Sequence, residues 1–325
     1  MSEYMAYGGQ AVIEGVMMRS PRHFAVACRK PDGSLVVHEE PIGNSLLGRI
    51  RWMNRPFLRG SLALVDAIAL GLKALSYAAN VQTDSETVSP TGEGGSAKTG
   101  ASKGATELAI GATLALSFAL GLALFVALPT LLTQLVQGTL GVTAPTARNL
   151  LDGIIRIMIF LAYVGLISFM HNIRRVFQYH GAEHKAINTF EAGLPLNLEN
   201  ALPASRIHPR CGTSFIVVVL LATIIVHSVF PRPDHALVRI ALHLALLPLV
   251  AGASYELIRW AGRCRNATVL QMLLAPGLWS QRLTTREPTP DQVEVALAAL
   301  AHVVAREQSD VQLEAVTALP AAEPA

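Results

Sequence analysis

The chain has 325 residues, of which 51% are hydrophobic and only 15% are charged. Its mean hydropathy of +0.41 is too high for an ordinary soluble domain and indicates a membrane protein. The formal charge of +3 is small, and no basic block or aromatic platform is present. We therefore expect membrane lipid as a partner and no nucleic acid.

Residues 1–60 are expected to form a small cytoplasmic β unit followed by a basic connector. One strand is predicted around Gly15, and a hairpin follows it with its turn at residues 31–33. Glu14 lies inside the first apolar run, and we expect it to be a solvent-facing strand residue. The unit would then be an antiparallel hairpin with a third strand beside it.

Residues 61–80 read as a helix of mostly Leu, Ala and Ile. It is long enough to span a membrane, but it carries Asp66 and Lys73 on one face. We therefore expect it to lie in the interface or to pack on the bundle, with a spanning helix as the alternative. Residues 81–106 are rich in Gly, Ser and Thr with almost nothing apolar, which predicts a disordered linker.

A transmembrane bundle is expected over residues 107–260. It contains four apolar segments, each near the roughly 20 residues that a helix needs to cross about 30 Å of hydrocarbon. Pro129 is expected to kink or end the first of them. Asp152 and Arg156 are spaced to pair with each other, and His227 and His243 are expected to be interhelical or hydrated groups. The segments are residues 108–136, 150–170, 214–230 and 237–258.

Four spans place both termini and the loop 171–212 on the same side of the membrane. That side holds 22 of the 26 lysines and arginines. The positive-inside rule makes this side cytoplasmic. We therefore expect a multi-pass protein of the bacterial inner membrane with both termini in the cytoplasm.

The cytoplasmic C-terminal segment covers residues 261–308. A loop is expected through residues 276–279, and Pro290 after Thr289 predicts the start of a helix that runs to about Arg306. Residues 309–325 are rich in Ala and Pro and are expected to be a disordered tail.

The stretch that carries chemistry is H-x-x-E-H at residues 180–184. We expect the second apolar helix to continue through it, because no proline or turn cluster intervenes before Gly193. Two imidazoles at i and i+4 share a helix face and can bind one metal ion. His180 and His184 are therefore predicted ligands, and Glu183 is the predicted general base, as in the inverted zincin pattern. A hydrated polar helix end is the alternative.

Three further residues are expected near the same membrane face. His208 and Cys211 precede the third span, and Glu256 closes the fourth. Any of them could complete a catalytic zinc site, which takes about three protein ligands of the His, Cys or carboxylate type. An exposed loop histidine, a small buried thiol and an interfacial carboxylate are their respective alternatives.

Three sequence blocks are GGQAVIEGVMMR at residues 8–19, YHGAEHK at 179–185 and HPRCGTSF at 208–215. Together they resemble the signature of the YqhQ family of bacterial membrane proteins. The resemblance covers residues 5 to about 290. It implies an integral membrane protein with a metal site, and it supplies no substrate because the function of the family is unknown.

The predicted fold is a mainly α integral membrane protein with about four transmembrane helices, a small cytoplasmic β unit and a cytoplasmic C-terminal helix. The predicted function is that of a metal-dependent hydrolase, with a divalent ion, preferably zinc, at the cytoplasmic face. The alternative is a non-catalytic transporter subunit or assembly factor, with a structural metal or polar cluster.

Overall fold

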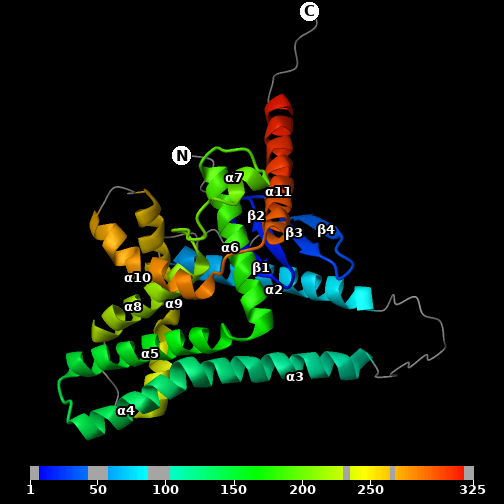
Figure 1. Cartoon of the computed structure of the whole chain (residues 1–325). Coiled ribbons are helices and arrows are strands. Elements are labelled where there is room, and N and C mark those ends of the chain that lie inside the picture. Colours follow the sequence, from blue (N-terminus) through cyan, green and yellow to red (C-terminus); the bar gives the residue numbers. More distant parts are fainter. Residues whose placement is uncertain (1–6, 43–57, 87–102, 230–234, 264–267, 318–325) are drawn as a thin grey trace, which may run out of the picture.

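The structure is a computed structural model, and it describes residues 7–42, 58–86, 103–229, 235–263 and 268–317. Near the N-terminus lies an antiparallel sheet in which every strand pairs with its neighbour in the chain, in the order β1-β2-β3-β4. The strands are β1 (Gly8–Val12), β2 (Gly15–Arg19), β3 (His23–Arg29) and β4 (Leu35–Pro41). The sheet is therefore a simple meander (Figure 1).

The expected hairpin is present, since β3 and β4 pair across the turn that contains Gly33 at φ 86°. The single strand expected around Gly15 is wrong. Val12 pairs with Gly15, so the chain turns back within Ile13 and Glu14 and forms two strands. Glu14 has φ 49°, a left-handed conformation that few residues with side chains adopt. It occupies this tight turn and is not a solvent-facing strand residue.

The other regular elements of the described chain are helices. In Figure 1, α3, α4 and α5 form a lower layer, and α6 climbs from it with the sheet and α11 on one side and α8 and α10 on the other. The helices are α2 (Leu58–Glu86), α3 (Lys103–Leu122), the π-helical segment η3 (Ala123–Ala127), α4 (Leu128–Leu140), α5 (Pro145–Ile167), α6 (His171–Glu191), α7 (Leu198–Ala201), α8 (Gly212–Val229), α9 (Ala236–Arg263), α10 (Thr268–Thr284) and α11 (Pro290–Thr317).

Both faces of the sheet are covered, because successive side chains of a strand point to opposite faces. Val16 and Met18 of β2 pack with Tyr179 of α6 and Leu300 of α11 in one core. The opposite face, which includes Met17, packs against α2 in a second core. The β unit is thus a layer between α2 and the α6–α11 pair, which holds β1 beside the motif helix.

Four described helices are long and apolar enough to cross a membrane. They are Ala63–Thr83, Ala115–Leu140, Thr146–Ile167 and Ile240–Ile258. Three of these overlap expected spans. The expected span at 214–230 corresponds to a shorter apolar helix, Gly212–Val226. The helix expected at 61–80 is also long and apolar enough to be a candidate membrane span, although its Ala74 and Ala78 pack on the sheet.

The structure differs from the expected helix boundaries at two places, between α5 and α6 and around Pro129. The helix expected to continue from residue 150 through the motif breaks after α5, and Met170 adopts the extended conformation that precedes α6. This break changes the direction of the chain and aims the polar helix α6 away from the apolar layer. At Pro129 the helix continues, but a π-helical segment directly precedes α4.

Three predicted irregular segments are partly helical. The loop expected at residues 276–279 lies inside α10, which contains Pro276. The expected linker begins later, because α2 runs to Glu86 and α3 starts at Lys103; residues 87–102 lie outside the described residues. The expected tail is helical to Thr317, and residues 318–325 lie outside the described part.

Candidate metal centre

The motif helix α6 presents two histidines on one face. His180 and His184 are one turn apart, and their ring centroids are 4.5 Å apart. Each ring is held by a backbone carbonyl from another segment. The Nδ1 of His180 lies 2.9 Å from the carbonyl oxygen of Thr284, and the Nδ1 of His184 lies 2.6 Å from that of Arg206.

These carbonyl contacts define the tautomers. A carbonyl oxygen can only accept, so Nδ1 of each ring must carry the proton. The Nε2 atoms are then unprotonated in the neutral rings and can bind a metal ion. Metal-ligating histidines usually donate their other N–H in this way to a carboxylate or carbonyl. In both histidines the hydrogen bond from Nδ1 to a carbonyl orients the ring so that Nε2 is free to face a metal ion.

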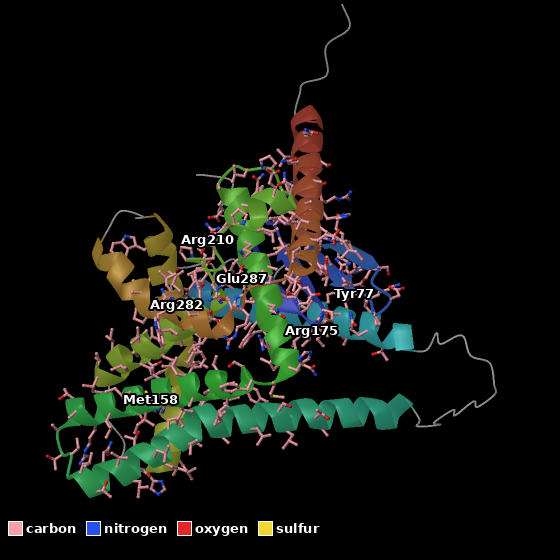
Figure 2. The ribbon with its side chains drawn as sticks, in the orientation of Figure 1. Tyr77, Met158, Arg175, Arg210, Arg282 and Glu287 are labelled. Carbon is pink, nitrogen blue, oxygen red and sulfur yellow. The ribbon has the colours of Figure 1, made fainter. Side chains whose placement is uncertain are left out.

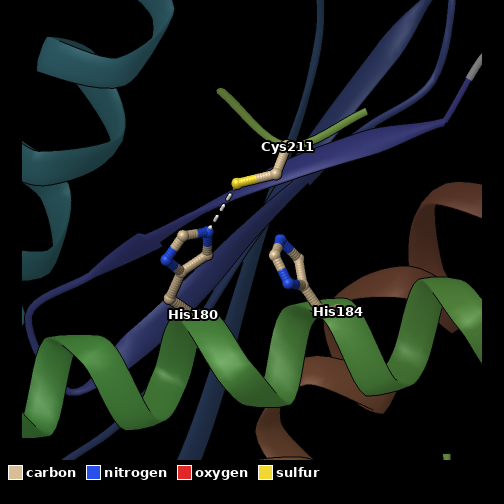
Figure 3. A group of neighbouring side chains, drawn as sticks. All are labelled: His180, His184 and Cys211. Atoms are coloured by element: carbon tan, nitrogen blue, oxygen red, sulfur yellow. Dashed lines mark hydrogen bonds between the residues drawn. The ribbon is translucent and has the colours of Figure 1, made fainter. Parts of the chain in front are cut away.

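Cys211 completes a cluster of three. It lies directly before α8, and its Sγ is 3.1 Å from Nε2 of His180 (Figure 3). One ligand atom from each of His180, His184 and Cys211 lies within 4.8 Å of the others. Figure 3 shows the two rings rising from the same face of α6 toward the sulfur. Cys211 is about 30 residues from the two histidines in sequence, but the fold brings it beside them.

The cluster is largely buried. His184 is 2% exposed and Cys211 7% exposed, whereas His180 is half-buried. Burial lowers the pKa of His184, which favours the neutral ring that binds metals. Its buried Nε2 lies near the Cys211 thiol but makes no hydrogen bond of normal geometry to the described residues. A buried polar atom in this state is costly, and a metal ion would satisfy it.

The segment after α10 forms the wall behind His180. A Cβ on Gly181 would lie 2.2 Å from the carbonyl oxygen of Arg286, so only glycine allows this close approach. The backbone N–H of Arg286 also donates to the carbonyl of Phe177. Together with the Thr284 carbonyl, these contacts fix the segment against one face of α6.

Gln281 of α10 holds the loop that carries Cys211. Its Oε1 accepts from the backbone N–H of His208 at 2.9 Å, and its Nε2 donates to the His208 carbonyl at 2.7 Å. Nε2 also lies 2.6 Å from Oγ of Ser214. The side chain is fully buried. Sequence reasoning missed Gln281, because a glutamine in an apolar helix has no spacing signal.

Glu183 lies next to the histidines and faces the β unit. Its carboxylate accepts from the backbone N–H of Gly9 in β1. A Cβ on Gly9 would lie 2.9 Å from Cγ of Glu183, so the glycine makes room for this contact. Burial raises the pKa of Glu183 to about 7, against the lowering effect of His180 and the Gly9 N–H. The first and second sequence blocks therefore meet at Glu183.

The structure does not bring His208 or Glu256 into the ligand group, which consists of His180, His184 and Cys211 among the described residues. The His208 ring lies beside His184, but its Nδ1 accepts from the backbone N–H of Arg210. Its Nε2 faces a carboxylate oxygen of Glu191 at 3.4 Å. The ring is thus turned toward Glu191. Glu256 is half-buried in α9.

A second contact joins the β unit to α6. Arg175 donates to both carboxylate oxygens of Glu14, at 2.5 Å each, and Tyr179 donates to one of them at 3.3 Å. Figure 2 labels Arg175 near the lower end of α6, and it labels Arg210 and Glu287, which belong to other segments, higher up in the view. The contact explains why a charged residue occupies the strained turn, since Glu14 anchors the β1–β2 hairpin to α6.

Comparison with known proteins now gives the relationship of the chain. Residues 55–306 match a family described as a protein of unknown function (DUF1385). The chain belongs to this family. It is also 35% identical, over 294 residues and 90% of both chains, to the "Uncharacterized protein YqhQ" of Bacillus subtilis (strain 168). No solved structure matches the chain. The resemblance to the YqhQ family is therefore confirmed. Membership of DUF1385 does not identify an activity, because the family is described as of unknown function.

Proposed function

We propose that the chain is a metal-dependent hydrolase of the bacterial inner membrane, with its site at the cytoplasmic face. One observation carries the proposal. His180 and His184 have their Nδ1 protons directed at backbone carbonyls, and the opposite Nε2 atoms lie with Cys211 Sγ within 4.8 Å of one another. Imidazoles oriented in this way support the binding of a metal ion.

The ligand types favour zinc. Thiolate and imidazole donors suit zinc among the common divalent ions, whereas magnesium and calcium prefer oxygen. Catalytic zinc sites have three protein ligands and an open position for water, whereas structural sites have four protein ligands. When bound, the ion would supply Lewis acidity and a nucleophile at neutral pH.

The remaining roles fall to residues around the ligands. Glu183 would move the proton, since its buried carboxylate lies one residue before His184 and is held in place by the Gly9 N–H. His180 is the half-buried ligand, so substrate would approach on its side. Gln281 and Thr284 would keep the ligands in place without touching the substrate.

A second function is favoured by the burial of the site. His184, Cys211 and Glu183 are each 7% exposed or less. A closed metal site of this kind would stabilise the junction of α6, α8 and α10 in a non-catalytic protein, such as a transporter subunit or assembly factor. Full coordination by protein groups would favour this role, and an open position would favour the enzyme.

The proposal is tested by elemental analysis of the purified, detergent-solubilised protein. His180→Ala, His184→Ala and Cys211→Ser should each remove most of the bound metal, because each side chain supplies about a third of the protein ligands. His171→Ala is the matched control, since His171 is exposed on the same helix. It should leave the metal content unchanged, and so should His208→Ala.

Glu183→Gln separates ligand from base. The variant should keep its metal, while hydrolysis of a panel of ester, amide and phosphoester reporters falls by roughly a hundredfold or more. If Glu183→Gln loses metal as fully as His180→Ala, Glu183 is a ligand and not the base. If the three ligand changes leave the metal content unaltered, there is no metal at this cluster.

A further inference from the structure

Two threonine hydroxyl groups connect the Cys211 sulfur to α10. Thr213 is the second residue of α8, and its Oγ1 lies 3.0 Å from Sγ of Cys211. Thr284 is the last residue of α10, and its Oγ1 donates to Oγ1 of Thr213 at 3.3 Å. Thr284 is buried and Thr213 is half-buried. The sulfur is therefore linked to a second helix through a short chain of hydroxyl groups.

The backbone at the start of α8 makes another contact with the same sulfur. The first N–H groups of a helix have no partner inside it, and the residue before the helix often supplies a side-chain acceptor. Cys211 occupies this position, because its carbonyl accepts from the N–H of Phe215 at 3.3 Å. The backbone N–H of Thr213 donates to Sγ at 3.4 Å. Thr213 thus reaches the sulfur with its N–H and with its hydroxyl.

The partners decide which atoms donate. Nδ1 of His180 carries the ring proton, so Nε2 can only accept, and the thiol of Cys211 donates to it at 3.1 Å. A thiol has one proton, so the sulfur accepts from its other partners. The hydroxyl of Thr213 accepts from Thr284 and keeps its own proton for the sulfur. Thr213 therefore supplies two donors to Cys211.

These contacts close a ring that contains two of the three candidate ligands. The backbone carbonyl of Thr284 lies 2.9 Å from Nδ1 of His180 and orients its imidazole. The hydroxyl of Thr284 orients Thr213, and Thr213 orients the Cys211 sulfur. The sulfur then returns to Nε2 of His180. The two ligand atoms are therefore held relative to each other by one residue of α10 and by Thr213.

We propose that Thr213 is a positioning residue of the candidate metal site, which sets the direction and the donor strength of the Cys211 sulfur. This role rests on the proposed metal function, because it concerns the sulfur as a ligand. Hydrogen bonds to a ligating sulfur draw electron density away from the metal, and partners of this kind tune both metal affinity and reactivity. Thr213 would in this way keep a bound ion a stronger Lewis acid.

The test is cobalt substitution of the purified, detergent-solubilised full chain. Cobalt(II) bound to a thiolate gives a sulfur-to-cobalt charge-transfer band, which reports directly on the sulfur. Thr213→Val removes the hydroxyl with little change of side-chain shape and keeps the backbone N–H. Loss of the hydrogen bond raises the energy of the sulfur electrons, so the band should move to longer wavelength. The cobalt affinity should fall by roughly ten- to a hundredfold.

Thr213→Ser provides the rescue, because it keeps the hydroxyl and removes only the methyl group. It should give the native band and the native cobalt affinity. Thr83→Val is the matched control, since Thr83 is exposed and its hydroxyl donates to a carbonyl of its own helix, α2. It should change neither quantity.

Thr284→Val provides a second variant if Thr213→Val does not fold. It removes the hydroxyl that orients Thr213, and the backbone carbonyl that holds His180 remains. The band should move in the same direction by a smaller amount.

The outcomes separate the role of Thr213 from the proposed function. A wild-type chain without a sulfur-to-cobalt band would show that Cys211 is not a ligand, and it would overturn both. A native band that stays unchanged in the folded valine variants of Thr213 and Thr284 would overturn only the role of Thr213. A Thr213→Ser band displaced as far as that of Thr213→Val would do the same, because the hydroxyl would then have no effect.

Discussion

Glu183 and Glu14 are the two acidic residues through which the β unit meets the motif helix. Glu183 accepts the Gly9 N–H, and Glu14 accepts from Arg175 and Tyr179. Both contacts require a special backbone, since Gly9 has no Cβ and Glu14 has φ 49°. Such strain persists only where the surrounding structure compensates for it, and it is commonly found at functional sites.

Gly181→Ala should destabilise the fold at the candidate site. The new methyl group would lie 2.2 Å from the Arg286 carbonyl oxygen, so the backbone must move, at a cost of about 1–3 kcal/mol. The movement also displaces the carbonyl that orients His180, and bound metal should fall. A lowered melting temperature in detergent checks the first effect, and elemental analysis checks the second.

Gly165→Ala is the matched control for this change. Gly165 also lies in a helix, but a Cβ there would meet nothing within 4 Å. Alanine favours a helix by roughly 0.8–1 kcal/mol over glycine, so the variant should melt at the same or a higher temperature. Equal melting of both variants would contradict the close contact at Gly181.

Among the elements, α10 and α11 carry different parts of the site. The C-terminal part of α10 supplies Gln281 and Thr284, which hold the two ligand segments. The helix α11 covers one face of the sheet with Val293, Leu297 and Leu300, which share an apolar face of the helix. Its role in the site is indirect, because the same core contains Tyr179 of α6.

Leu300→Ala should therefore weaken the whole β unit. Leu300 is fully buried, and replacing a buried leucine by alanine costs about 2–5 kcal/mol. Val311→Ala is the control on the same helix, because Val311 is 44% exposed. The two variants are compared by thermal unfolding. If Leu300→Ala costs no more than Val311→Ala, then α11 does not pack on the sheet as described.

At the scale of the molecule, an apolar helical layer carries a compact unit made of the sheet, α6 and α11. The candidate metal site lies where α6, α8 and α10 meet, and the buried Asp152–Arg156 pair lies within the apolar layer. Exposed apolar side chains such as Phe118 and Leu166, each 70% exposed, are compatible with a membrane environment. This arrangement places the two polar clusters in different surroundings.

The protein should fractionate with the inner membrane and resist extraction by carbonate and by high salt. Apolar helices are held by lipid and not by charge, so neither treatment should release it. Recovery of the protein in the soluble fraction after either treatment would end the membrane assignment.

Reporter fusions test the orientation. Fusions at Glu287 and after residue 325 should both report the cytoplasm, because most lysines and arginines lie on that side of the predicted topology. A fusion at Gly141, in the connection between α4 and α5, should report the opposite side and serves as the control. A periplasmic signal at Glu287 would place the candidate metal site on the wrong side for the proposed function.

The sequence by itself determined the apolar helices, the start of α11 and the pairing of His180 with His184. These features depend on composition and on contacts between residues three or four apart, which a helix fixes locally. It also identified Cys211 as a candidate, although His208 and Glu256 remained equal alternatives. The pair Asp152–Arg156 was likewise readable from its spacing, and it forms.

Only the tertiary structure decided which distant groups meet. Cys211, and not His208, lies with the two histidines because Gln281 and Thr284 hold the loop and the helix, and these contacts join residues about 70 to 100 positions apart. The break before α6 and the turn at Glu14 were also hidden, because each conformation is stabilised by contacts from elsewhere in the chain. Local spacing indicates the candidate residues of a site, and long-range packing determines which of these residues lie close together.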